Sequence, residues 1–268
     1  GFNSLMKQAN QLKWPKRPKF IFTSNNFDTD EIFKIWTASK AEFGCLYFTG
    51  QHGDAYSRVF DNPRIEEETA DKFITWGWTD GLPQHTPAFL FKTSGKKRKY
   101  DQEGGLLLIE VLVGHRYDLW DETTEFAEYW NDQIELVQLL GNEVNKRLTI
   151  RLHPGCQDMR WSEVQRWHDF DPDLSLELGK KTIKDLIGKS RLVIHSYNST
   201  GIFETLSQGI PTIAFWQNEL DDLRESVKPY YQALVDVGIV HLSPSSAAKK
   251  INEIWDNVET WWEEPEVK

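Results

Sequence analysis

The chain has 268 residues, which is long enough to bury a large α/β core. Its formal net charge of −10 and sequence pI of about 5.3 disfavour binding to nucleic acid through broad phosphate neutralisation. Its two cysteines lack CxxC spacing, which argues against a disulfide framework or a structural zinc site and fits a reducing cytoplasm. The sequence contains neither an apolar run of roughly 18 residues nor a signal-peptide pattern.

The first hundred residues alternate predicted strands and helices, which is typical of βαβ units with a parallel sheet. The predicted elements are a short helix at 2–13, a strand at 19–23, a helix at about 28–43, a strand at 45–49, a short acidic helix after residue 63 and a strand at 73–78. Residues 79–104 are rich in glycine and proline and carry the basic run 96–99. We interpret them as an interdomain linker whose basic run is solvated, with a binding role for that run as the alternative.

The second half begins with the strongly apolar stretch 105–113, which predicts a central strand covered on both faces. The pattern then predicts a helix at 122–141, strands at 148–152 and 174–178, helices at 161–168 and 182–188, a βαβ-type unit at 191–216, a strand at 239–242 and a terminal helix at 245–262 that could cross back onto the first domain. We therefore predict an α/β protein with two Rossmann-type domains, 1–103 and 104–268.

The stretch 191–216 organises the second domain. A short β-branched run ends at a small polar loop, and Ser199 and Thr200 open the helix that follows. A helix that begins at the carboxyl end of a parallel strand favours a phosphate, and two hydroxyls strengthen that site. Glu204 lies one turn further along and could accept hydrogen bonds from a ribose. The alternative is that Ser199 or Thr200 only caps the helix and that Glu204 is only solvated.

Two further loops of the second domain follow strands, and they contribute Arg116 and His153. In an open parallel sheet such loops share one crevice, so we expect these side chains to meet the helix tip and to bind a phosphate leaving group. Taken singly, His153 could merely end a strand and Arg116 could be a surface cation. The sequence contains no GxGxxG and no GxxxxGK[ST] motif, which disfavours a dinucleotide dehydrogenase or a P-loop kinase.

In the first domain, His52 and Asp54 directly follow a predicted strand. An acid or base at this position is plausible chemistry, although a histidine before a glycine is often only a turn residue. The remaining histidines have no partner at metal-ligand spacing, and the sequence has no HExxH motif, so we predict no metal site and no cofactor.

Several motifs resemble a known family. QHGDAY at 51–56, ITWGW at 74–78 and YNSTGIFETLSQGIPTIAFW at 197–216 are similar to bacterial transferases from surface-carbohydrate loci. The HP dipeptide at 153–154 and the Ser-Thr pair at 199–200 resemble the donor-binding motifs of GT-B sialyltransferases and capsule Kdo transferases, which use CMP-activated sugars. Members of the first family typically read QHGGGYG where this chain has Asp54 and Ala55, and they are longer at the N-terminus. We therefore expect this chain, which begins at a glycine, to contain an incomplete N-terminal domain of a longer protein.

The resemblance implies a GT-B-like, metal-independent glycosyltransferase in the cytoplasm. It would transfer a sugar from a nucleotide-activated donor, expected to be CMP-linked, to a surface glycan or glycolipid, and the acceptor could bring it to the membrane periphery. His52 and Asp54 would be catalytic. The donor phosphate would be bound by Arg116, His153, Ser199 and Thr200, and the nucleotide by Tyr197, Asn198 and Glu204. The alternatives are a nucleotide-sugar epimerase, a polyol-phosphate transferase and a non-catalytic nucleotide- or glycan-binding module.

Overall fold

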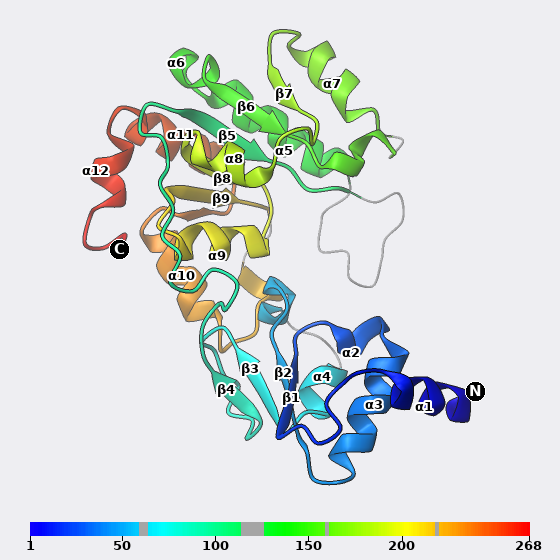
Figure 1. The fold of residues 1–268 in the computed structure, drawn as a ribbon. Helices are drawn as coiled ribbons and strands as arrows, with labels where there is room; N and C mark the ends of the chain where they lie inside the picture. The colour runs from blue at the N-terminus through cyan, green and yellow to red at the C-terminus, as the bar shows by residue number, and fades with distance from the viewer. Residues whose placement is uncertain (59–63, 114–125, 159–160, 218–219) are drawn as a thin grey trace. The chain divides into compact units, whose positions relative to one another are not determined.

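The structure is a computed structural model of residues 1–268, and it describes all of them except 59–63, 114–125, 159–160 and 218–219 (Figure 1). By its contacts the chain divides into two compact units. Unit 1 comprises Gly1–Phe91 and Asp222–Val227, and unit 2 comprises Lys92–Asp221 and Lys228–Lys268. The sequence analysis placed the division at 103/104, so the last part of the predicted linker belongs by its contacts to unit 2.

Unit 1 contains a parallel sheet with the strand order β1-β2-β3-β4. Its strands are β1 (Phe20–Thr23), β2 (Leu46–Gly50), β3 (Lys72–Thr75) and β4 (His85–Pro87), and its helices are α1 (Phe2–Gln11), α2 (Asn26–Thr29), α3 (Glu31–Ala41), the 3-10 helix η1 (Asp54–Ser57) and α4 (Ile65–Glu68). The interpretation of 79–104 as a linker throughout is wrong, because β4 pairs with β3 from Phe73↔His85 to Thr75↔Pro87. Proline is tolerated there because β4 is the outer strand in the described sheet.

The helix predicted at 28–43 is divided at Asp30. The Asp30 carboxylate accepts hydrogen bonds from the backbone N–H groups of Ile32 (3.1 Å) and Phe33 (2.9 Å), which makes Asp30 the N-cap of α3. Such a cap satisfies donors that have no partner within the helix. Phe33 and Trp36 then pack with Ile21 of β1 in the core of unit 1.

The two faces of the unit 1 sheet differ in cover. Consecutive parallel strands joined by right-handed crossovers carry their connecting helices on one face. On that face Ile21 is buried, whereas on the other face Phe20 is 59% exposed, Phe22 42% and Leu46 49%. Phe22 there contacts Phe91 edge to face, with ring centroids 6.1 Å apart.

Unit 2 contains a parallel sheet with the strand order β10-β9-β8-β5-β6-β7. Its strands are β5 (Gly105–Ile109), β6 (Leu148–Arg151), β7 (Ser175–Glu177), β8 (Ser190–His195), β9 (Thr212–Phe215) and β10 (Val240–His241). Its helices are α5 (Phe126–Leu139), α6 (Asn142–Asn145), η2 (Pro154–Gln157), α7 (Glu163–Phe170), α8 (Ile183–Gly188), α9 (Thr200–Ser207), η3 (Leu220–Asp222), α10 (Lys228–Asp236), α11 (Pro244–Ile254), η4 (Trp255–Asn257) and α12 (Val258–Trp262).

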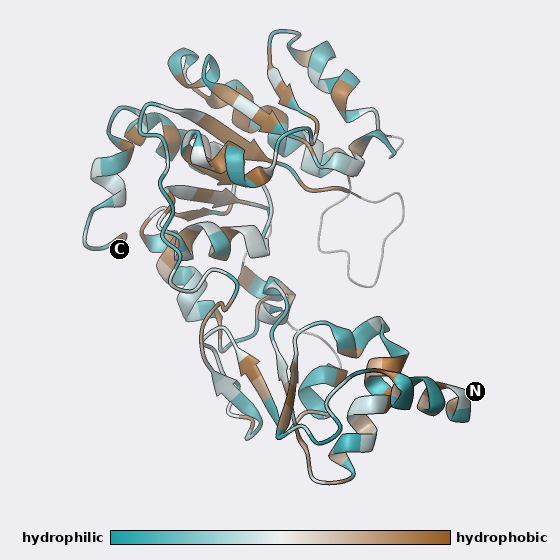
Figure 2. Cartoon of the chain, viewed as in Figure 1, coloured by the Kyte–Doolittle hydropathy of each residue, from teal (hydrophilic) through white to brown (hydrophobic). Residues whose placement is uncertain are grey.

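The core of unit 2 is built on the neighbouring strands β5 and β8. Alternate residues point to opposite faces of a strand, so Leu108 packs with Leu136 of α5 and Ile251 of α11, while Leu107 packs with Leu186 of α8 on the other face. β5 is brown over most of its length in Figure 2 because it consists mainly of leucine and isoleucine, and its three leucines are buried. This is the covered, continuously apolar strand that the stretch 105–113 predicted, although its strand pairing ends at Ile109.

The C-terminal helices remain in unit 2, so the prediction that the terminal helix crosses back is wrong. The segment that joins unit 1 is Asp222–Val227, which runs from the last residue of η3 to the residue before α10. Within the described ranges, none of the helices combines the length and the apolar character needed to span a bilayer. Cys45 and Cys156 are free thiols.

Two glycines of unit 2 give a matched test of this packing. A Cβ on Gly105 would lie 2.3 Å from the Arg147 carbonyl oxygen, whereas a Cβ on Gly188 would meet no atom within 4 Å. We expect Gly105→Ala to lower the free energy of unfolding by about 1–3 kcal/mol, the usual cost of overpacking. Gly188→Ala should leave it unchanged or raise it by up to about 1 kcal/mol. Urea denaturation followed by tryptophan fluorescence measures both, and equal stability of the two variants would contradict the close packing of β5.

Candidate functional site

The carboxyl end of β8 is the point where unit 2 changes from apolar strand to polar loop. β8 lies between β5 and β9, and its last four residues are buried. The loop 196–199 follows, and α9 begins at Thr200 with Ser199 as N-cap, as the sequence predicted. Small polar side chains interrupt the strand here because they hydrogen-bond locally and favour helix caps. The first turn of α9 carries no acidic side chain, so its positive end is not neutralised locally.

Ser199 has the backbone of a cap, but its hydroxyl does not act as one. Its φ of −146° and ψ of 155° are extended, and among the described residues its side chain accepts no capping hydrogen bond. Ser199 is only 6% exposed, and its Oγ has no hydrogen-bond partner in the described part of the chain. A buried hydroxyl without a partner costs free energy. The hydrogen-bonding capacity of Ser199 at the tip of α9 is therefore not used within the described residues, and the half-buried Thr200 lies beside it.

His195 lies directly beneath this tip and was not predicted. It is 3% exposed, and burial lowers the pKa of its imidazole to about 3, so the ring is neutral at physiological pH. Its Nε2 lies 3.4 Å from the Thr205 hydroxyl, and its Nδ1 is buried without a partner among the residues that the structure describes. A Cβ on Gly201 would lie 2.7 Å from the His195 ring, so glycine allows the first turn of α9 to rest on the imidazole.

Asn198 is held by the helix that follows β9. The Tyr231 hydroxyl of α10 donates to Asn198 Oδ1 at 3.0 Å. The Tyr231 ring contacts Phe203 and Trp216 edge to face, with centroids 5.8 Å and 6.2 Å away. Tyr197 is half-buried in the same loop. The loop conformation is thus fixed by aromatic packing as well as by the backbone of α9.

His153 lies at the carboxyl end of β6, on the far side of β5 from β8. It is exposed, and its Nδ1 accepts a hydrogen bond from the Gly155 N–H at 3.1 Å, which caps η2. Partial burial, together with the nearby Arg151 charge, lowers the pKa of His153 below its usual value. The sheet therefore brings His153 to the same edge as Ser199, as predicted. Arg116, expected at this edge as well, lies outside the described residues.

Glu204 has a partner that the sequence did not indicate. Its carboxylate Oε1 accepts from the Lys92 ammonium at 2.6 Å, and the adjacent Thr93 and Ser207 hydroxyls are 2.6 Å apart. Lys92 comes from the predicted linker, so this part of the chain is fastened along α9. Glu204 lies on the same helix face as Thr200, since residues four apart share a face.

A buried carboxyl pair lies behind this edge. Glu110 follows β5 directly, is 4% exposed, and its Oε2 lies 3.5 Å from the Trp167 Nε1. Burial, reinforced by the nearby Glu163 carboxylate, raises the pKa of Glu110 to about 8, and burial raises that of Glu163 to about 7. The sequence analysis missed both residues because Glu110 sits inside an apolar run and Glu163 in a helix.

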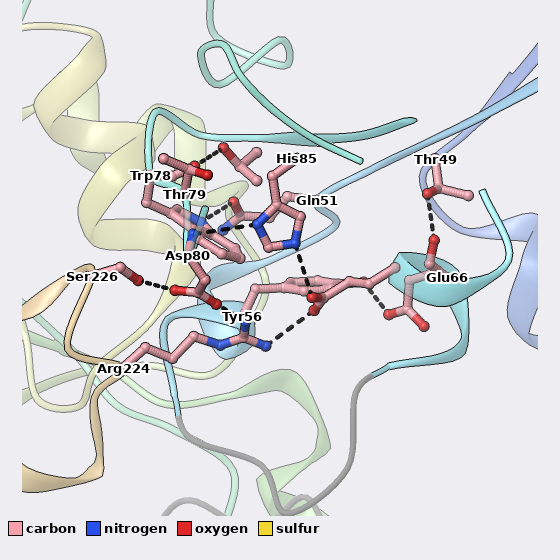
Figure 3. Close-up of polar contacts among 12 residues, drawn as sticks. Thr49, Gln51, Tyr56, Glu66, Trp78, Thr79, Asp80, His85, Arg224 and Ser226 are labelled. Atoms are coloured by element: carbon pink, nitrogen blue, oxygen red, sulfur yellow. Dashed lines mark hydrogen bonds and ion pairs between the residues drawn. The ribbon is translucent and has the colours of Figure 1, made fainter. Parts of the chain in front are cut away.

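In unit 1, Gln51 fixes the start of the loop that carries His52 and Asp54 (Figure 3). Its side-chain oxygen accepts from the Trp76 N–H at 2.9 Å and from the Trp78 Nε1 at 2.8 Å, and its amide donates to the Gly53 carbonyl at 2.8 Å. His52 is exposed, whereas Asp54 is 8% exposed and its carboxylate lies 3.8 Å from the Arg58 guanidinium.

The end of this loop meets a buried ionic network (Figure 3). Glu67 is 1% exposed, and its two oxygens lie 3.2 Å from the His85 Nε2 and 3.0 Å from the Arg224 guanidinium. Arg224 also pairs with Asp80 at 2.6 Å, and this pairing together with a hydrogen bond from Ser226 lowers the pKa of Asp80 against the opposing effect of burial. Sequence patterns gave no signal for this network, because its members are far apart in the chain.

The raised pKa of Glu110 makes a prediction about pH. Below pH 4.5 the carboxyl binds its proton in the folded and unfolded states alike. Between about pH 4.5 and 8 the unfolded state loses the proton and the folded state keeps it, so this group makes the protein less stable as pH rises. Glu110→Gln should therefore raise the thermal midpoint relative to wild type at pH 8 but not at pH 4. A difference between the two proteins that does not vary with pH would contradict a neutral Glu110.

Within the described ranges, no group of three or more His, Cys, Asp or Glu side chains is placed to hold a metal ion.

Residues 1–268 match the family model described as LIC12162 family transferase. Among solved structures, the chain is similar to MurG from Acinetobacter baumannii, with 13% identity and a TM-score of 0.51, covering 97% of this chain and 69% of that one. It is also similar to a Listeria monocytogenes protein described as a UDP-N-acetylglucosamine 2-epimerase, with 11% identity and a TM-score of 0.56, covering 99% of this chain and 73% of that one. A search of curated proteins found no match.

These findings confirm two predictions. The neighbours have GT-B-type folds, which agrees with the predicted α/β fold with parallel sheets. The predicted resemblance to a transferase family is confirmed over the full length of the chain, and the chain belongs to the LIC12162 family of transferases.

Proposed function

We propose that the protein is a glycosyltransferase that moves a sugar from a nucleotide-activated, CMP-linked donor to a glycan or glycolipid acceptor. The observation that supports this proposal best is the buried Ser199 hydroxyl, which has no partner among the described residues at the N-terminus of α9. The enzyme would work in the cytoplasm and would reach the membrane only through a lipid-linked acceptor.

The donor phosphate would bind at the tip of α9. An α-helix directs the N–H groups of its first turn toward its tip, and in the eight-residue helix α9 Ser199 and Thr200 also carry hydroxyls there. His195 beneath the tip is neutral, so it adds no charge to this phosphate site. His153 at the same sheet edge can donate to a phosphate oxygen when it is protonated or when it carries its proton on Nε2. Together with Arg116, these groups would stabilise the leaving phosphate without a metal ion.

The nucleoside would lie along the loop and helix. Glu204 is oriented by Lys92 at one oxygen, which leaves the other oxygen to accept from ribose hydroxyls. Asn198 is oriented by Tyr231, and its amide N–H₂ group can donate to a nucleotide acceptor. Tyr197, half-buried beside it, completes the predicted nucleotide set.

On the acceptor side, we assign the base to the loop of His52 and Asp54. His52 is exposed, whereas the Asp54 carboxylate is buried against Arg58. In the transfer, the base removes the proton from the acceptor hydroxyl while the hydroxyl oxygen forms a bond to the anomeric carbon of the donor sugar. The bond from that carbon to the donor phosphate breaks, and the nucleotide leaves with the electron pair.

The test is a panel of CMP-, UDP- and CDP-linked sugars incubated with the protein in the presence of EDTA. We expect release of CMP and transfer of the sugar to an added glycan acceptor, because the phosphate is stabilised by protein groups alone. Release that requires added Mg²⁺ or Mn²⁺ would contradict metal-free stabilisation. Conversion of a UDP-sugar into its epimer would favour an epimerase, and binding without turnover would favour a non-catalytic binding module.

A pair of hydroxyl variants tests the phosphate site. We expect Ser199→Ala to weaken CMP binding by about 1–3 kcal/mol, the loss of a hydrogen bond to a charged group, with little effect on cytidine. The unliganded protein should be at least as stable as wild type, because this hydroxyl is buried without a partner and caps nothing within the described chain. The matched control is Thr182→Ala, which removes a cap that accepts from the Asp185 N–H. It should cost about 1 kcal/mol of stability and leave CMP affinity unchanged.

Calorimetric titration and thermal melting measure both quantities for each variant. A Ser199→Ala protein that binds CMP as tightly as wild type, or that loses affinity for cytidine to the same extent, would contradict a phosphate contact at Ser199.

A further inference from the structure

The segment Leu223–Val227 comes from the middle of the unit 2 sequence but belongs to unit 1. Leu223 and Val227 are each 3% exposed, and Leu223 forms an antiparallel bridge with Arg58. The Arg224 backbone N–H donates to the Ser57 carbonyl at 2.8 Å. The segment is therefore docked against the end of the loop that begins at Gln51.

The Arg224 side chain reaches further than its backbone (Figure 3). Its Nε donates to the Arg58 carbonyl at 3.1 Å, and its terminal nitrogens pair with Asp80 at 2.6 Å and with Glu67 at 3.0 Å. Its guanidinium also lies 5.0 Å from the Trp78 ring centroid. A planar guanidinium with several fixed donors can bind all of these groups at once, which an ammonium cannot do.

Trp78 connects the two ends of the loop. Its Nε1 donates to Gln51, the first residue of the loop, and its ring faces Arg224, which holds the last residue, Arg58. The loop Gln51–Arg58 is thus fixed at both ends by groups that contact one another. Such support is what keeps a reacting side chain in a productive geometry.

We propose that Arg224 is a positioning residue for the loop Gln51–Arg58, and so for the acceptor chemistry of His52 and Asp54. This inference rests on the proposed function of that loop. The chain continues from Arg224 into α10, where Tyr231 holds Asn198 of the donor loop. Arg224 belongs to unit 1 by its contacts, and the chain enters unit 2 four residues later, at Lys228.

The experiment compares Arg224→Lys and Arg224→Gln with a matched arginine. Arg191 also donates to backbone carbonyls, pairs with Glu103 and lies 5.1 Å from the Trp255 ring, but it is at the opposite end of β8 from the donor loop. We expect both Arg224 variants to lower kcat at least tenfold with the donor that gives turnover in the panel. CMP affinity should stay within twofold of wild type, and Arg191→Lys should leave both quantities unchanged.

Arg224→Lys keeps a cation beside Glu67, so it distinguishes an effect on the position of the loop from an effect on the stability of the fold. Removing the charge altogether leaves a buried carboxylate short of a partner, and Arg224→Gln could therefore unfold. The lysine variant should melt near wild type and exchange its amide hydrogens faster at residues 54–58. This exchange measurement requires no activity, so it tests Arg224 even if no donor gives turnover. Unchanged exchange, or kcat and CMP affinity that fall together, would overturn the proposal.

Discussion

All strand pairs in the two sheets are parallel within the described chain, and this constraint decides where chemistry can occur. Parallel pairing sends every connection around to the other end of the sheet, so the loops after the strands collect at one edge. In unit 2, His153 follows β6 and Ser199 follows β8, and both lie at this edge although β5 separates the two strands. In unit 1 it places His52 after β2 and Trp78 after β3.

Two groups of buried polar side chains differ in whether the described chain gives them partners. In unit 1, each carboxylate oxygen of Glu67 has a partner, so the interactions of this buried group are satisfied within the protein. In unit 2, Ser199 Oγ and His195 Nδ1 are buried without partners among the described residues. Both arrangements cost desolvation, but only the first is repaid within the chain. The first arrangement therefore supports a loop, and the second is the phosphate site that we propose.

The sequence predicted those features that depend on neighbouring residues. The start of α9 was evident because small polar residues interrupt an apolar strand, and the apolar character of β5 indicated a doubly covered strand. The division at Asp30 was missed because the apolar pattern continues across it and does not reveal that Asp30 caps a new helix. Strand β4 was missed because its proline suggested a linker. Contacts between residues far apart in the chain could not be predicted, since nothing near Arg224 in the sequence indicates that it pairs with Glu67. His195 was overlooked because it continues an otherwise apolar strand.

The bare face of the unit 1 sheet has a thermodynamic consequence. Phe20, Phe22 and Leu46 keep roughly half of their surface in water while the protein is folded. The heat capacity change of unfolding arises mainly from newly hydrated apolar surface, and this surface is already hydrated. Unit 1 should therefore gain less heat capacity on unfolding than its apolar content implies, which makes its stability curve flatter than that content alone would give.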